Sequence, residues 1–197
     1  MKNPAFFEKI ETIKLQDELS EFLGTFEDGI VEFSYLDIVK ASGHSCPTVA
    51  GAYLLCLEGL KALYKGEIPK RGEVFVSFKE DSIEGVAGVI ANVITHITGA
   101  TESYGFQGIA GNFVRRNLMD FKSNINSSVK FKRLDTNESV EVLYDPSSIQ
   151  GNPKQMVLMQ KILRNQATNE ERKLFGKIWQ KRVEDIFNNI DKVISVL

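Results

Sequence analysis

The stretch "SGHSCPTVAGAYLLCLEGLKALY", residues 42–64, joins a polar loop to a long apolar run. Proline suits the first turn of a helix, because the N–H that it lacks would have no partner there. Pro47 therefore predicts a helix that continues to about Tyr64, and Gly66 follows as a stop signal. The segments on either side of this helix decide the fold class.

Strand and helix patterns surround this helix. Residues 4–24 are predicted to be helical because Phe7, Ile10, Ile13 and Leu15 recur at helix-like spacing. The remaining predicted elements are a short strand and a helical turn in 29–41, a strand in "EVFVSFKE" (73–80), a second apolar helix in 83–97, and a hairpin whose strands "SVKFKRL" and "SVEVLYD" flank "DTNE".

The C-terminal segment has a different pattern. Thr168 and Glu171 fit a capping box, and apolar residues then recur every three to four positions up to Leu197. This spacing predicts a long amphipathic helix whose apolar stripe covers either its own domain or a partner. The loop bracketed by Pro146 and Pro153 marks the boundary before it.

The composition limits the class of protein. The chain has 197 residues with a net charge of −2, of which 43% are hydrophobic and 25% charged. These values are typical of one globular domain with a small appendage, and they do not favour a nucleic-acid partner. The longest apolar stretch, residues 85–100, is short for a membrane span, and the charged N-terminal segment does not suggest a signal peptide. With only two cysteines, we expect a cytoplasmic protein with reduced thiols.

His44 and Cys46 are the strongest candidates for chemistry. The residue before a proline favours extended backbone, where side chains two positions apart project to the same side. Both residues also precede a helix N-terminus, whose partial positive charge favours a thiolate. The pair could bind zinc or a related transition metal, or could act as a nucleophile with its base. The alternative is a buried thiol beside a histidine bonded to backbone.

Other candidates are less specific. His96 lies on the second apolar helix in a small and polar stripe, which suits either a ligand or close helix packing. Asp81 precedes that helix and could be a ligand, a proton acceptor or a cap. Arg115 could bind an anionic group through its two-pronged guanidinium or be ion-paired. Cys56 matches no metal spacing and is expected in the core.

The glycine-rich stretch "YGFQGIAGNFVRRN" is not a dinucleotide fingerprint. Its glycines, Gly105, Gly108 and Gly111, recur at intervals of three, and no clear strand precedes them. Glycines there are expected to allow tight turns or a close approach of backbone to a ligand.

Part of the sequence resembles a known family. "GHSCPTVAGAYL" (43–54) is similar to the G-H-x-C-P motif that opens proteins of the FmdE family, whose members resemble a component of molybdenum/tungsten formylmethanofuran dehydrogenase. "KEDSIEGV", "HITGAT" and "GFQGIAGNFVRRNL" resemble its acidic segment, its T-G-x-T turn and its glycine-rich segment, so the resemblance covers residues 30–121. The chain departs from the family at Thr48 (usually glycine), at Ile83 (often cysteine) and in lacking the C-x-x-C pairs of a zinc ribbon.

The resemblance implies an α+β fold in which an antiparallel sheet packs against helices, usually in a dimer. It also implies a metal, most often zinc, near the G-H-x-C motif, with His44 and Cys46 as ligands and Asp81 nearby. We therefore expect an FmdE-like α+β metal-binding domain in 1–150, a helical C-terminal extension in 151–197, and a homodimer.

Two functions follow as hypotheses. In the first, the chain is a small metal-dependent enzyme in which the ion acts as a Lewis acid or activates water. Asp81 or His96 would complete or serve its site, and Arg115 would hold a small anionic substrate. In the second, the chain is a metal-binding accessory module of a redox complex, and its C-terminal helix docks a partner. A thiol enzyme without metal is a third hypothesis.

Overall fold

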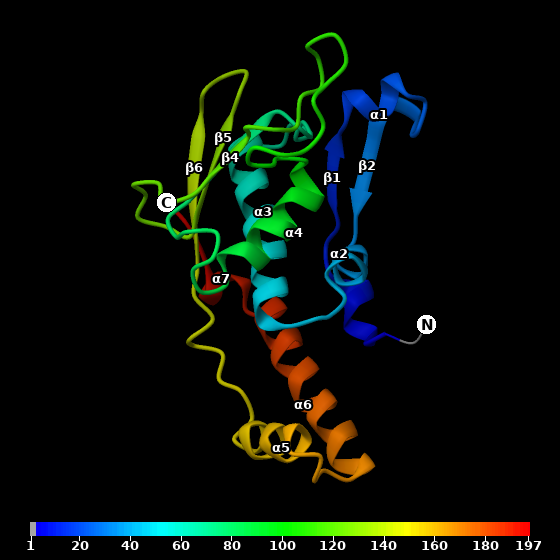
Figure 1. Ribbon diagram of the computed structural model, residues 1–197, viewed down its shortest axis with the longest axis vertical. Coiled ribbons are helices and arrows are strands. Elements are labelled where there is room, and N and C mark those ends of the chain that lie inside the picture. The colour runs from blue at the N-terminus through cyan, green and yellow to red at the C-terminus, as the bar shows by residue number, and fades with distance from the viewer. Residues whose placement is uncertain (1–2) are drawn as a thin grey trace.

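Residues 3–197 of the computed structural model are described, and they form two sheets with helices in an α+β arrangement (Figure 1). The larger sheet has five strands in the order β4-β3-β5-β6-β7. Its strands are β3 (Val74–Phe78), β4 (Met119–Asp120), β5 (Val129–Arg133), β6 (Ser139–Tyr144) and β7 (Ile194–Val196). β4 runs parallel to β3, and the other neighbours are antiparallel. The predicted fold class is confirmed, with one parallel pair added to the sheet.

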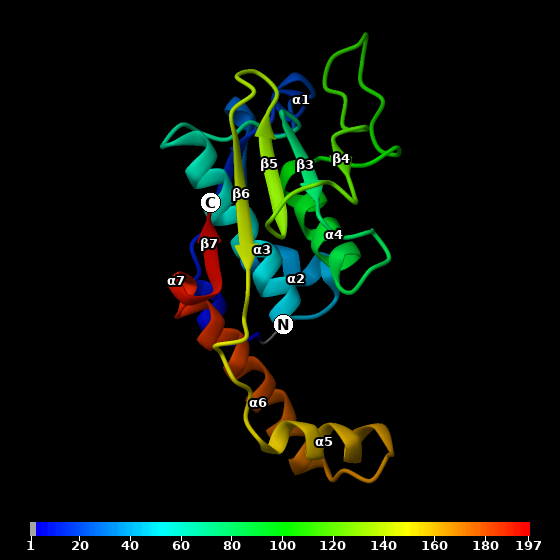
Figure 2. The ribbon, with the colours of Figure 1, turned by 90° about the vertical axis from the view of Figure 1, so that its left-hand side faces the viewer.

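The helix α3 (Pro47–Tyr64) packs against one face of this sheet, with the bounds that the sequence predicts (Figure 2). Two of its glycines allow a very close approach to the strands. A Cβ at Gly59 would lie 2.7 Å from the Phe131 ring of β5, and one at Gly51 would collide with the Tyr144 ring of β6. Larger residues at these positions would force the helix away from the sheet.

The predicted strand in 73–80 and the predicted hairpin are also confirmed. In β3, Val74, Val76 and Phe78 are buried, whereas the alternate residues face away from the core. β5 and β6 pair as a hairpin. The second apolar helix, α4 (Ala87–Thr98), packs on α3, and α2 (Tyr35–Ser42) follows the strand β2 (Ile30–Phe33) as expected.

The prediction of one helix over 4–24 is wrong. This region contains η1 (Ala5–Lys9), β1 (Ile13–Gln16) and the short helix α1 (Glu18–Phe22), and η2 (Glu27–Gly29) follows. Ile13 and Leu15 lie two residues apart and are both buried, which is the period of a strand. Their partner is β2, in a separate two-stranded sheet, so the contact that decides their conformation lies outside residues 4–24.

The C-terminal segment is helical at first but does not end as a helix. It contains α5 (Lys154–Leu163) and α6 (Asn169–Phe187), and the predicted capping box of Thr168 and Glu171 is present. The predicted continuation to Leu197 is wrong: a short α7 (Ile190–Val193) leads into β7, which pairs with β6. This strand satisfies backbone groups that β6 would otherwise expose at the sheet edge. Residues 151–197 therefore complete the sheet of residues 1–150.

The helix α6 divides into two halves. Val183 and Ile186, in its second half, are fully buried in the core. Its first half and α5 pack on each other and extend away from the rest of the molecule (Figures 1 and 2). No helix within residues 3–197 combines the length and apolarity needed to cross a bilayer.

Candidate functional site

The His-Ser-Cys-Pro loop connects α2 to α3. Gly43 ends α2 in the left-handed region at φ 76°, and Cys46 is extended at φ −148° and ψ 169°, as expected before a proline. The Cys46 Sγ accepts a hydrogen bond of 3.4 Å from the backbone N–H of Val49 and so caps α3. The sulfur therefore lies at the positive end of an 18-residue helix.

His44 is exposed, and its ring is oriented by the backbone. The Nδ1 atom lies 3.0 Å from the carbonyl oxygen of Ser42, which can only accept a hydrogen bond. Nδ1 is therefore the donor in this contact, and Nε2 is the ring nitrogen left for another partner. A carbonyl that orients the distal nitrogen in this way is a common support for metal-binding histidines.

Ser45, between these two residues, is held by α6. Its carbonyl oxygen accepts hydrogen bonds from Trp179 Nε1 at 3.0 Å and Gln180 Nε2 at 3.1 Å. Its hydroxyl donates to Gln180 Oε1 at 3.0 Å and lies 2.9 Å from the Tyr35 hydroxyl. We call Trp179 and Gln180 the clamp. The clamp fixes the backbone between His44 and Cys46, although Trp179 comes 134 residues later in the chain than Ser45.

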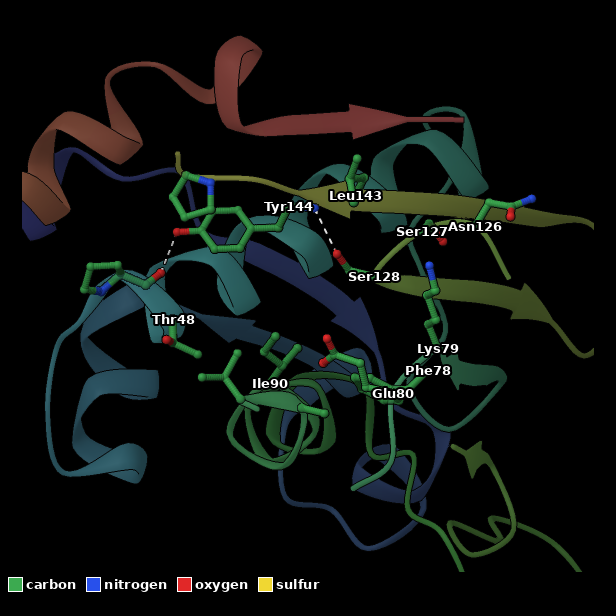
Figure 3. Close-up of a pocket in the computed structure, with 14 residues that line it drawn as sticks. Thr48, Phe78, Lys79, Glu80, Ile90, Asn126, Ser127, Ser128, Leu143 and Tyr144 are labelled. Carbon is green, nitrogen blue, oxygen red and sulfur yellow. Dashed lines mark hydrogen bonds between the residues drawn. The ribbon is translucent and has the colours of Figure 1, made fainter. Parts of the chain in front are cut away.

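A pocket of about 410 Å³ begins at the residue after Cys46 (Figure 3). Its walls come from the first turn of α3, the end of β3, the start of α4, the loop before β5 and the end of β6. The lining residues are Pro47, Thr48, Phe78, Lys79, Glu80, Val86, Ala87, Ile90, Asn126, Ser127, Ser128, Leu143, Tyr144 and Pro146. Apolar walls with a few polar groups are typical of small-molecule sites.

Hydrogen bonds fix the wall that β6 contributes. The Tyr144 hydroxyl donates to the carbonyl oxygen of Pro47 at 2.7 Å, and the Tyr144 N–H donates to the Ser128 hydroxyl at 3.1 Å (Figure 3). Burial is the main cause that raises the pKa of Tyr144, so this phenol stays neutral at physiological pH. Tyr144 therefore connects the sheet to the loop that carries Cys46.

The electrostatics of the pocket favour a ligand with an electron-rich end. Both α3 and α4 begin at its wall, and each helix N-terminus carries a partial positive charge. Lys79 and Glu80 add one charge of each sign at the end of β3. Among the residues that line the pocket, Glu80 is the one with a carboxylate. A bound ligand could use this carboxylate as a proton acceptor or hydrogen-bond acceptor.

Asp81 lies next to Glu80 but has its own partner. Its Oδ2 atom is 2.6 Å from Lys122 Nζ, and the Ser82 hydroxyl donates to Oδ1 at 3.2 Å. The hydrogen bond from Lys122 is the main cause that lowers the pKa of Asp81. Asp81 is thus an ionised, ion-paired residue beside the pocket.

His96 is distant from the pocket. It is exposed near the end of α4, nine residues after Ala87 at the pocket wall, which corresponds to about 13 Å along a helix. Its backbone carbonyl accepts a hydrogen bond from Arg71. The structure therefore does not bring His96 to His44 and Cys46.

Arg115 is buried elsewhere in the molecule, with 6% of its surface exposed. Its Nη2 donates to Asp17 Oδ1 at 2.6 Å, and Arg71 Nη1 donates to the other oxygen of Asp17 at 2.9 Å. Burial opposes the ionised form of Asp17, but the two arginines lower its pKa. This group joins the glycine-rich loop to the start of α1, so Arg115 has a structural partner and does not line the pocket.

His44 and Cys46 are the two candidate metal donors of this loop. Within residues 3–197 no group of three or more His, Cys, Asp and Glu side chains is arranged to hold an ion. Cys56 is fully buried, which raises the pKa of its thiol, and its predicted place in the core is confirmed. His44 and Cys46 can supply one nitrogen and one sulfur, a donor set that suits zinc with water or a further ligand in the remaining positions.

Sequence reasoning missed several residues of the site. Glu80 ends the predicted strand 73–80, but β3 stops at Phe78 and Glu80 lies in the bend that follows, so strand alternation does not place its side chain. Thr48 stands out in the sequence only as a departure from a family motif. Tyr144 and the clamp gave no local signal, since their contacts depend on residues that are far away in sequence.

The chain matches no family model and no curated protein.

Proposed function

We propose that this chain is an FmdE-like metal-binding protein in which His44 and Cys46 hold a divalent transition ion, most simply zinc, beside a pocket for a small anionic molecule. One observation carries the proposal: the loop with both donors leads directly into the wall of the pocket, at the N-terminus of α3. The free Nε2 of His44 and the helix-capping sulfur of Cys46 support it.

The pocket supports an enzymatic role. An ion held by two protein ligands keeps open positions, and would there supply Lewis acidity or an activated water. The α3 and α4 N-termini would orient the electron-rich end of the ligand, and the apolar walls would exclude water. Glu80 is better placed to exchange a proton with a bound ligand than Asp81, His96 or Arg115, because it lines the pocket.

Metal analysis tests this proposal. The purified, untagged protein should contain about one metal ion per chain, as expected for a single zinc-type site. His44→Ala and Cys46→Ala should each remove most of it. The matched controls are His96→Ala and Cys56→Ala, which change the other histidine and the other cysteine of the chain and should keep the metal. Metal loss in either control, or none in the first two variants, would contradict the ligand assignment.

A second candidate is a metal-binding accessory module that docks a partner. The arm formed by α5 and the first half of α6 favours it, because this arm extends from the body and exposes apolar side chains. We propose a homodimer as its simplest assembly. A water molecule on the metal that exchanges with added ligands would favour the enzyme, whereas a closed four-ligand site would favour the accessory role.

A further inference from the structure

Two surfaces at opposite ends of the molecule are apolar and exposed. We define the knob as residues 17–29, which contain α1 and η2, and the arm as residues 154–178, which contain α5 and the first half of α6. Figures 1 and 2 both place the knob and the arm at opposite ends of the long axis. Any partner that covers one surface therefore leaves the other free on the same chain.

The knob exposes aromatic and aliphatic side chains. Phe22 is 63% exposed, Leu23 59% and Phe26 49%. The centroids of the Phe22 and Phe113 rings lie 5.4 Å apart, so the glycine-rich loop packs against the patch. Clustered exposed apolar residues of this kind are uncommon on monomers and mark interaction surfaces.

The arm exposes a second apolar set. Leu163 is 75% exposed, and Met156 and Val157 are each more than half exposed. Leu174, on α6, adds to this set. The main packing partner of α5 is α6, so the hairpin presents its outer side chains to solvent.

The charges of the two surfaces are opposite. The knob contains five acidic residues and no lysine or arginine. Asp17 is paired with Arg71 and Arg115 and Glu18 with Lys70, so Glu21, Glu27 and Asp28 carry the net negative charge of the knob. The arm contains six lysines and arginines against two acids. In the part of the chain that the structure describes, Glu27 on the knob and Lys173 and Lys177 on the arm have no ion-pair partner within the molecule.

We infer that the knob is the docking surface for the arm of a second copy of this chain. This inference rests on the proposed homodimer and names its surfaces. The knob and the arm lie at opposite ends of the long axis. Two copies that lie antiparallel, related by a two-fold axis perpendicular to that long axis, therefore place the arm of each copy on the knob of the other. Such an assembly closes as a dimer. An arm-to-arm contact would instead place two surfaces of net positive charge against each other.

Charge reversal tests the docking. Light scattering after gel filtration should show a dimer for the native sequence. Glu21→Lys/Glu27→Lys and Lys173→Glu/Lys177→Glu should each raise the dimer dissociation constant by at least about tenfold, because each reversal places like charges in contact. An equimolar mixture of the two variants should recover the dimer, because both of its contacts then join opposite charges. Recovery also shows that neither variant is misfolded.

The control is Glu8→Lys/Asp191→Lys, which makes the same change in net charge outside the knob and should leave the dimer intact. Three results would overturn the inference: a monomeric native protein, a dimer that survives reversal of the knob, or a mixture that stays monomeric. A dimer that survives reversal of the knob leaves the homodimer standing but moves its interface. Metal content, measured in parallel, should not change in any of these variants, so the metal proposal is judged separately.

Discussion

Removing the clamp should loosen the loop that carries both proposed metal donors. Trp179→Phe deletes the indole N–H that reaches the Ser45 carbonyl and keeps an aromatic ring in place. Gln180→Ala deletes the second donor to that carbonyl and also the acceptor of the Ser45 hydroxyl. A net hydrogen bond contributes about 1 kcal/mol, so we expect losses of about 1 kcal/mol for the first variant and about 2 kcal/mol for the second.

The double variant is the more informative one. Either single variant leaves the Ser45 carbonyl with one donor, whereas Trp179→Phe/Gln180→Ala leaves it with neither. A half-buried carbonyl without a partner costs roughly 1–3 kcal/mol more, so the double variant should lose about 1 kcal/mol more than the sum of the single variants. Because the clamp fixes the residue between His44 and Cys46, its removal should also weaken metal binding by about tenfold, as the loss of other supporting contacts does.

Two measurements check this prediction. Urea unfolding followed by circular dichroism gives the free energies of unfolding, and competition with a chelator gives the metal affinity. Gln160→Ala, which removes an exposed amide from α5, is the matched control and should change neither quantity. Strictly additive losses, or an unchanged metal affinity in the double variant, would show that the clamp does not position the loop.

Two further predictions concern stability. Gly51→Ala should destabilise the protein by about 1–3 kcal/mol in urea unfolding, because its Cβ collides with the Tyr144 ring. Gly176→Ala, on an open face of α6, should stabilise the protein by about 0.5–1 kcal/mol. If Gly51→Ala were the more stable of the two variants, the close packing of α3 on the Tyr144 ring would be contradicted. Asp17 has a lowered pKa in the fold, so its contribution to stability is present above its unfolded pKa of about 3.9 and is lost as the pH falls further. In Asp17→Asn the free energy of unfolding should depend less on pH in that range. Near neutrality it should be about 3–5 kcal/mol lower than in the native protein, because the variant leaves two arginines unpaired. An unchanged dependence of the free energy of unfolding on pH would refute this prediction.

Local patterns predicted the elements whose decisive contacts are local. Pro47 and the apolar run behind it defined α3 to the residue, and the alternation in 73–80 defined β3. Elements completed by distant partners were misjudged. β1 depends on β2, and β7 depends on the edge of β6, so neither can be recognised from its own few residues.

The same distinction applies to the site. His44 and Cys46 are proposed as ligands because the proline after them restricts the local backbone, and this assignment stays a prediction. The sequence left Arg115 open between a substrate anion and an ion pair, and the structure shows the ion pair. Its partner Asp17 lies 98 residues earlier, and no periodicity indicates such a pair. The pocket combines five separate segments, and only their packing shows that Glu80 belongs to it.

The clamp has a practical consequence, because Trp179 is the chain's sole tryptophan. Its indole hydrogen-bonds to the backbone one residue away from both proposed ligands, so its emission carries information on that loop without any added label. An optical reporter is thereby already present where an experimenter would have chosen to attach one, and titrations of ions or small molecules can be followed on the unmodified protein.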